Sequence, residues 1–73
     1  MLLVPVMSSN LAAIGYNEAT TELQVQFVNG RIYAYYNVPL EVYMGLVNAP
    51  SKGQYFSYMI RSQPGLYSPM RIF

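Results

Sequence analysis

The stretch from residue 22 to residue 28 alternates between polar and hydrophobic side chains with a period of two until its final residue, Val28. One face carries Leu23, Val25 and Phe27, and the other carries Glu22, Gln24 and Gln26. This alternation is typical of a half-buried strand. Asn29-Gly30 follows and favours a two-residue type I′ turn, whose central residues both need positive φ. Because residues 31–38 are rich in β-branched and aromatic side chains, the sequence predicts a β-hairpin.

A two-residue turn also fixes which residues face each other across the hairpin. Val28 would lie opposite Arg31, and the pairing would continue to Leu23 opposite Tyr36. In this register the buried face consists of Leu23, Val25, Phe27, Ile32, Ala34 and Tyr36. The polar face carries Glu22, Gln24 and Gln26 together with Tyr33 and Tyr35. Two outward tyrosines among glutamines are the least expected feature of this hairpin.

Residues 10–16 predict a further strand, and the polar turn at residues 17–21 connects it to the hairpin. The simplest topology for three such consecutive strands is an antiparallel meander. After Val38 the periodicity changes to that of a helix, with Pro39 suited to the first helical position because it lacks an N–H group. This helix has one apolar stripe and ends at residues 48–50. The stripe consists of Val42, Tyr43, Leu46 and Val47.

Ser51, with Gln54 three residues later, predicts a capping box at the start of a second helix. Its apolar stripe consists of Tyr55, Phe56, Met59 and Ile60, and Gln63-Pro64-Gly65 ends it. Each stripe needs a partner surface, which the apolar face of the hairpin provides. The sequence therefore predicts an α+β fold in the order β-β-β-α-α, a three-stranded antiparallel meander followed by two short helices packed on one face.

A chain of 73 residues has room for one domain, here residues 1–73 with a core over about 8–61 and a tail over 62–73. Charged residues make up only 10% of the chain. A small domain leaves much of its surface exposed, and this surface must be largely neutral or apolar, which favours a partner or a homo-oligomer over a lone monomer. The apolar opening of the chain is seven residues long and contains Pro5, too short to span a membrane. We therefore expect a cytoplasmic protein with no membrane partner.

The absence of Cys and His limits the chemistry available to the chain. It removes disulfides, thiolate and imidazole metal ligands, and the usual general base near pH 7. Serine hydroxyls lack an activating partner, and Glu18 and Glu22 are expected to be solvated surface carboxylates. We therefore predict no catalytic residues, no bound metal and no cofactor. The net charge of +1 is also small for a nucleic-acid-binding protein.

Two groups of residues remain candidates for binding. Tyr33 and Tyr35 could stack unpaired bases on a sheet face; alternatively they brace the neighbouring glutamines or lie under the tail. Lys52, next to Ser51 and Gly53 at the start of the second helix, could help to hold an anion; alternatively it is an exposed lysine after a cap. Arg61 lies at the other end of this helix, nine residues after Lys52, so the two cations should point to opposite sides.

A series of short motifs follows one order along the chain. It consists of Ser8-Ser9, Ile14-Gly15-Tyr16, Leu23-x-Val25-x-Phe27, Gly30, Tyr33-Ala34-Tyr35, Val38-Pro39, Val42-Tyr43, Leu46, Ala49, Ser51-Lys52-Gly53-x-Tyr55-Phe56 and Ile60-Arg61. Over residues 8–61 this order and spacing resembles the KTSC domain, which occurs at the C-terminus of some lysyl-tRNA synthetases and in free-standing bacterial and phage proteins. The central tyrosine-x-tyrosine motif of the family corresponds to Tyr33 and Tyr35. The chain departs from the family at residues 57–59 and 62–64, where members often carry an Asn and more basic residues.

The resemblance implies an RNA- or nucleotide-binding role, which follows from the attachment of the domain to a tRNA synthetase. The leading hypothesis is accordingly a non-enzymatic binding module with weak affinity for RNA or a nucleotide. The rival hypothesis is a protein–protein or self-assembly module, because aromatic and neutral polar surfaces are typical of interface cores. Salt dependence separates the two, since binding to phosphates weakens steeply as salt rises.

Overall fold

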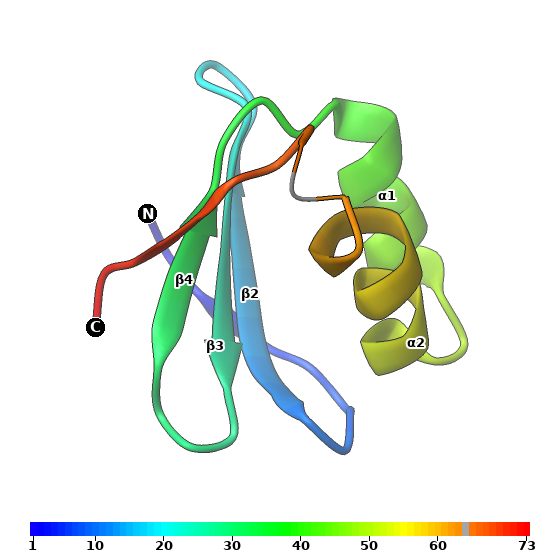
Figure 1. Ribbon diagram of the computed structural model, residues 1–73. Helices are drawn as coiled ribbons and strands as arrows, with labels where there is room; N and C mark the ends of the chain where they lie inside the picture. Colours follow the sequence, from blue (N-terminus) through cyan, green and yellow to red (C-terminus); the bar gives the residue numbers. More distant parts are fainter. Residues whose placement is uncertain (64) are drawn as a thin grey trace.

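Within residues 1–63 and 65–73, which the computed structural model describes, five antiparallel strands form one sheet. The order of the strands in the sheet follows the chain, β1-β2-β3-β4-β5. The elements are β1 (Val4–Pro5), β2 (Leu11–Asn17), β3 (Glu22–Phe27), β4 (Ile32–Tyr35), α1 (Leu40–Asn48), α2 (Lys52–Phe56), the π-helical segment η1 (Ser57–Arg61) and β5 (Pro69–Arg71). Figure 1 shows α1 and α2 on one side of this sheet.

The structure confirms the α+β class, the antiparallel meander of β2, β3 and β4, and the helices on one face. The prediction of three strands is wrong, because β1 and β5 extend the sheet at its two edges. Each of these strands is only two or three residues long and contains a proline, Pro5 or Pro69. Strands this short show no alternation of hydrophobic and polar residues, and proline is tolerated at a sheet edge. The tail therefore forms part of the sheet.

The predicted register of the β3–β4 hairpin is also wrong, by one residue. The loop contains three residues, Val28–Gly30, and Phe27 N–H donates to Arg31 O at its base. Gly30 has φ of 91°, whereas the φ values of Val28 and Asn29 are not positive. This is the pattern of a type I turn followed by a glycine bulge, the three-residue alternative to a type I′ turn.

The additional loop residue turns every side chain of β4 to the opposite face. Val25 lies opposite Tyr33, and Leu23 lies opposite Tyr35, so both tyrosines face the helices. Tyr35 is only 3% exposed. Tyr36, predicted in the core, is instead 39% exposed on the other side of the sheet. Tyr33 and Tyr35 therefore do not lie on a polar outer face.

Replacing Gly30 by alanine should destabilise the domain by about 1–2 kcal/mol, the cost of a left-handed conformation for a residue with Cβ. The space around the position is open, so the cost comes from φ alone. Gly65 provides the comparison, because its surroundings are equally open. Urea denaturation of the two variants should show a loss for Gly30→Ala and little change for Gly65→Ala; equal stabilities would contradict the bulged turn.

Both helices begin close to their predicted positions. Pro39 has an extended backbone and is the N-cap of α1. It therefore precedes the helix, whereas the sequence predicts it as the first helical residue. Ser51 caps α2, its Oγ accepting a hydrogen bond from Gln54 N–H at 3.4 Å. Pro64, expected to help end the second helix, lies outside the described residues.

The second helix changes to π-helical winding at residue 57, and its apolar stripe changes with it. Phe56 and Ile60 are fully buried, but Met59 is 43% exposed, contrary to the predicted stripe. Ser62 N–H donates to Ser57 O at 3.0 Å, five residues earlier. A turn of this kind contains more residues than an α-helical turn, so Ile60 remains below Phe56 while Met59 faces outward.

The core lies between the sheet and the two helices. Its largest fully buried side chains are Leu11, Leu23, Val25, Val38, Leu46, Phe56 and Ile60. The helices approach closely where the Tyr55 ring lies against Gly45, and Tyr55 donates a 2.9 Å hydrogen bond to Val42 O. Tyr16 of β2 stacks on Tyr43 of α1 with ring centroids 4.5 Å apart. The first of these contacts joins the two helices, and the second holds α1 against the sheet.

Candidate functional site

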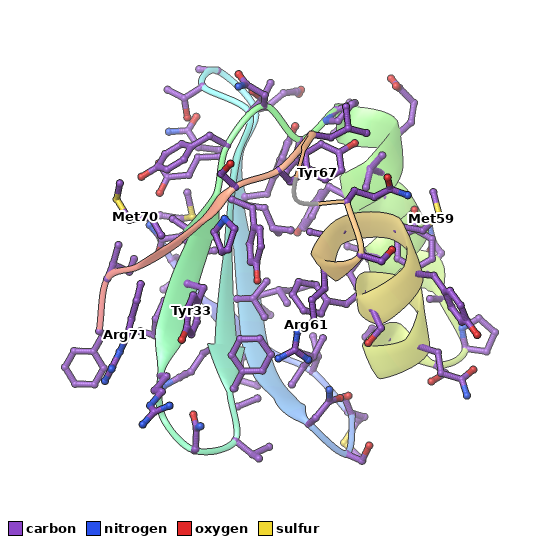
Figure 2. The ribbon with its side chains drawn as sticks, viewed as in Figure 1. Tyr33, Met59, Arg61, Tyr67, Met70 and Arg71 are labelled. Carbon is purple, nitrogen blue, oxygen red and sulfur yellow. The ribbon has the colours of Figure 1, made fainter. Side chains whose placement is uncertain are left out.

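A cleft of about 460 Å³ lies between the β3–β4 hairpin and the end of η1. It brings together residues from both ends and the middle of the chain. Its lining consists of Asn10, Phe27, Val28, Asn29, Arg31, Tyr33, Tyr35, Arg61 and Pro69. Arg61 reaches it from the helical layer and Tyr33 from the sheet, as Figure 2 shows. A cleft of this volume is within the range that accommodates small ligands.

The aromatic rings of the cleft pack edge to face. The Phe27 ring meets Tyr33 at a centroid distance of 5.7 Å and an angle of 82°, and meets Phe56 at 5.7 Å and 69°. Tyr35 packs on the same Phe56 at 5.4 Å and 78°. The guanidinium carbon of Arg61 lies 5.7 Å from the Phe27 centroid, within cation–π range. The rings therefore position the arginine at the cleft.

Burial raises the pKa of the Tyr35 hydroxyl above its ordinary value, and nearby Arg61 lowers it in part. The hydroxyl therefore remains protonated at neutral pH and can donate a hydrogen bond. Arginine remains charged under the same conditions. Arg31 and Arg61 thus give the cleft two permanent positive charges beside neutral aromatic groups.

The charges of the domain are separated along its length. Glu18 and Glu22 lie at the β2–β3 turn, and Glu41 lies in the first turn of α1, all at the upper end in Figure 1. Partial burial raises the pKa of Tyr16 at this end, and the charges of Glu18 and Glu41 raise it further. Arg31 follows the β3–β4 turn at the lower end. Arg31 and the acidic side chains therefore lie at opposite ends of the sheet, although the net charge is only +1.

The six candidate residues of the sequence analysis divide between different places. Tyr33, Tyr35 and Arg61 line the cleft. Ser51 and Gly53 line another depression of about 550 Å³, which has polar neighbours that include Ser57 and shares Asn10 with the cleft. Lys52 directs its ammonium group to Ala49 O at 3.3 Å. Lys52 and Arg61 therefore do not form one basic surface. This agrees with their spacing along the helix, which predicts that they point to opposite sides.

Arg31, Phe27, Asn10 and Asn29 are cleft residues that the sequence analysis did not identify. Phe27 was assigned to the core, and it does pack there, but its ring also forms part of the cleft wall. Asn10 lies against Gly53 as well as lining the cleft. Its side chain receives a hydrogen bond from Ser8 Oγ at 3.2 Å. The sequence offered one signal for Arg31, namely that this basic residue directly follows the predicted turn at Asn29-Gly30.

The described chain, residue 64 excepted, contains no cluster of metal ligands and no helix that could span a membrane. No three His, Cys, Asp or Glu side chains gather where they could hold a metal ion. No helix has the length and apolar character needed to cross a bilayer.

Known proteins share both the sequence and the structure of this chain. The sequence profile of the KTSC domain family matches residues 7–63. A lysine–tRNA ligase from Nostoc sp. is 47% identical over 55 residues, which are 75% of this chain but 10% of the ligase. The chain thus spans about a tenth of that relative. A protein from Stutzerimonas stutzeri is 37% identical over 60 residues, covering 82% of this chain and 84% of that protein.

A solved structure agrees with these sequence matches. The crystal structure of a KTSC domain protein from Yersinia pestis superposes with a TM-score of 0.87 at 32% sequence identity, covering 99% of this chain and 97% of the other. The agreement therefore extends over the edge strands as well as the central meander. The chain belongs to the KTSC domain family.

Proposed function

We propose that this domain is a non-enzymatic module that binds single-stranded RNA, with one nucleotide seated in the cleft. The observation that carries the proposal is the combination of Arg31 and Arg61 with the partly exposed rings of Phe27 and Tyr33 around one opening. Arginine pairs with phosphate through a planar fork of donors, and aromatic rings stack on bases. The cleft thus provides both kinds of contact that a nucleotide requires.

The separation of charge supports the same function. RNA would approach the end of the domain that carries the arginines, away from Glu18, Glu22 and Glu41. Because few basic residues are available, we expect the affinity to be low and strongly dependent on salt. The lysine–tRNA ligases among the relatives, as their name states, act on a tRNA. An accessory domain that holds unpaired RNA would fit such a protein.

The first test is fluorescence anisotropy with a labelled RNA hexamer, hexaadenylate, at two salt concentrations. Two phosphate contacts predict that the affinity of the wild-type domain falls at least about seven-fold between 50 and 200 mM salt. Arg31→Gln and Arg61→Gln should each weaken binding and reduce the salt slope by about 0.7, the share of one phosphate contact on a single strand.

Lys52→Gln is the matched control, because it removes the same charge outside the cleft while Lys52 is bonded to Ala49 O. Its affinity and salt slope should equal those of the wild type. Thermal melts of all variants separate loss of binding from loss of folding, particularly for Arg61, which packs on Phe27. Absence of wild-type binding at low salt would refute the proposal, as would equal losses in the Lys52 and Arg31 variants.

Self-association is the second candidate function, and a different surface favours it. The sheet face away from the helices carries Tyr36 and Met70, which are 39% and 55% exposed. Light scattering of the purified domain, with and without RNA, distinguishes self-association from RNA binding. A dimer whose molar mass is unchanged by high salt and by added RNA would favour self-association.

A further inference from the structure

We infer that the RNA ligand is an oligonucleotide of at least two consecutive nucleotides, held along a line of three arginines, Arg61, Arg31 and Arg71. We call this line the arginine track. The inference rests on the proposed function and adds the length of the ligand and the path that it follows. It comes from a smaller depression on the Arg31 side of the cleft, which a single nucleotide in the cleft would leave empty.

This depression has a volume of about 190 Å³ and lies at the edge of the sheet. Its lining consists of Asn29, Gly30, Arg31, Arg71 and Phe73. Asn29 and Arg31 also line the cleft, so the two spaces adjoin at the hairpin loop. A chain that passes from one space to the other would cross Arg31.

Strand β5 places Arg71 on the same side of the sheet as the cleft. Arg71 lies opposite Tyr33 in the pairing of β4 with β5, and directly opposed residues share a face. Strand β4 lies between β3 and β5, so these two strands are two strand spacings, or about 10 Å, apart. Figure 2 shows Arg71, Tyr33 and Arg61 in one row across the strands and the helix end. The track therefore has an arginine on each side of the central tyrosine.

The outer end of the track is fixed by backbone hydrogen bonds. Ile32 N–H donates to Phe73 O at 3.2 Å, and Phe73 N–H donates to Ile32 O at 3.3 Å. Arg71 Nε donates to the same Phe73 oxygen at 3.2 Å, a bond that does not use the terminal guanidinium nitrogens. The Phe73 side chain is 72% exposed although its backbone is held. A second base could stack on this ring while Arg71 contacts a phosphate.

The test compares AMP with hexaadenylate in a competition titration against labelled hexaadenylate. The hexamer should bind about ten-fold or more tightly than AMP, since an additional stacked base and phosphate are engaged. With three phosphate contacts, its affinity should fall about 18-fold between 50 and 200 mM salt, against about seven-fold with two contacts. Arg71→Gln should return the salt dependence to the lower value.

Arg71→Gln should weaken hexaadenylate binding by a larger factor than AMP binding, whereas Arg61→Gln should weaken both ligands. Arg71→Lys keeps the charge without the Nε hydrogen bond, so it should retain most of the salt dependence; a thermal melt checks that β5 remains paired. Equal affinity for AMP and hexamer, with no effect of Arg71→Gln, would overturn the inference while leaving the proposed function intact. Failure of both ligands to bind the wild type would instead refute the proposed function.

Discussion

Tyr35→Ala is expected to lower the free energy of unfolding by about 3–5 kcal/mol, the usual cost of truncating a buried aromatic residue. Tyr35 is 3% exposed, and its ring packs edge to face on the fully buried Phe56. Urea denaturation measures the loss directly. In a thermal melt, each kcal/mol corresponds to about 4–8 °C for a domain of this size, so the variant should melt at least about 12 °C lower.

Tyr36→Ala is the matched control, because it removes the same side chain from the next residue, just after the end of β4. Tyr36 is 39% exposed on the other face, where its hydroxyl lies 4.0 Å from the sulfur of Met70. We expect a loss of about 1 kcal/mol or less. A larger loss at Tyr36 than at Tyr35 would show that the hairpin has the two-residue turn and the opposite register.

Gly45→Ala should destabilise the domain by about 1–3 kcal/mol, the usual cost of overpacking a core. In an exposed helix the same substitution normally gains about 0.5–1 kcal/mol, because glycine loses more backbone entropy on folding. At position 45, however, a Cβ would overlap the Tyr55 hydroxyl and ring. Tyr55 is also held by its hydrogen bond to Val42 O, so it cannot simply rotate away.

The substitution of Tyr55 by alanine tests this explanation. In the Tyr55→Ala background the overlap is removed, and Gly45→Ala should become neutral or stabilising. Chemical denaturation of the two single variants and the double variant gives the coupling energy between the positions. Additive losses would show that the cost of alanine at position 45 arises elsewhere.

The hairpin shows how far sequence patterns determine this fold. Alternation over residues 22–28 correctly predicted a strand, and Asn29-Gly30 correctly located the turn. The same dipeptide is compatible with two- and three-residue loops, which differ in the backbone conformations of Val28 and Asn29 and in one residue of register. Both faces of β4 carry apolar side chains, so hydrophobicity could not decide between them. Packing of Tyr35 against Phe56, distant in sequence, distinguishes the two registers.

The candidate site was predictable to a similar extent. Tyr33, Tyr35 and Arg61 do line one cleft, but the tyrosines reach it from the helix-facing side of the sheet. The spacing along the second helix correctly predicted that Lys52 and Arg61 lie apart. It could not associate Arg61 with Arg31, because the two meet only when the helix end packs over Phe27. Sites formed by residues from different layers depend on tertiary packing, which local patterns do not encode.

The order of the strands has a consequence for how the chain folds. Pairing between consecutive strands across short turns closes small loops, a property associated with rapid folding. The pairing of β4 with β5 is the exception, because residues 36–68 separate the two strands and closing that loop costs more entropy. We therefore expect the central meander and helices to form first and β5 to join them last. The outer end of the proposed arginine track would then be the last part of the molecule to assemble and the first to open.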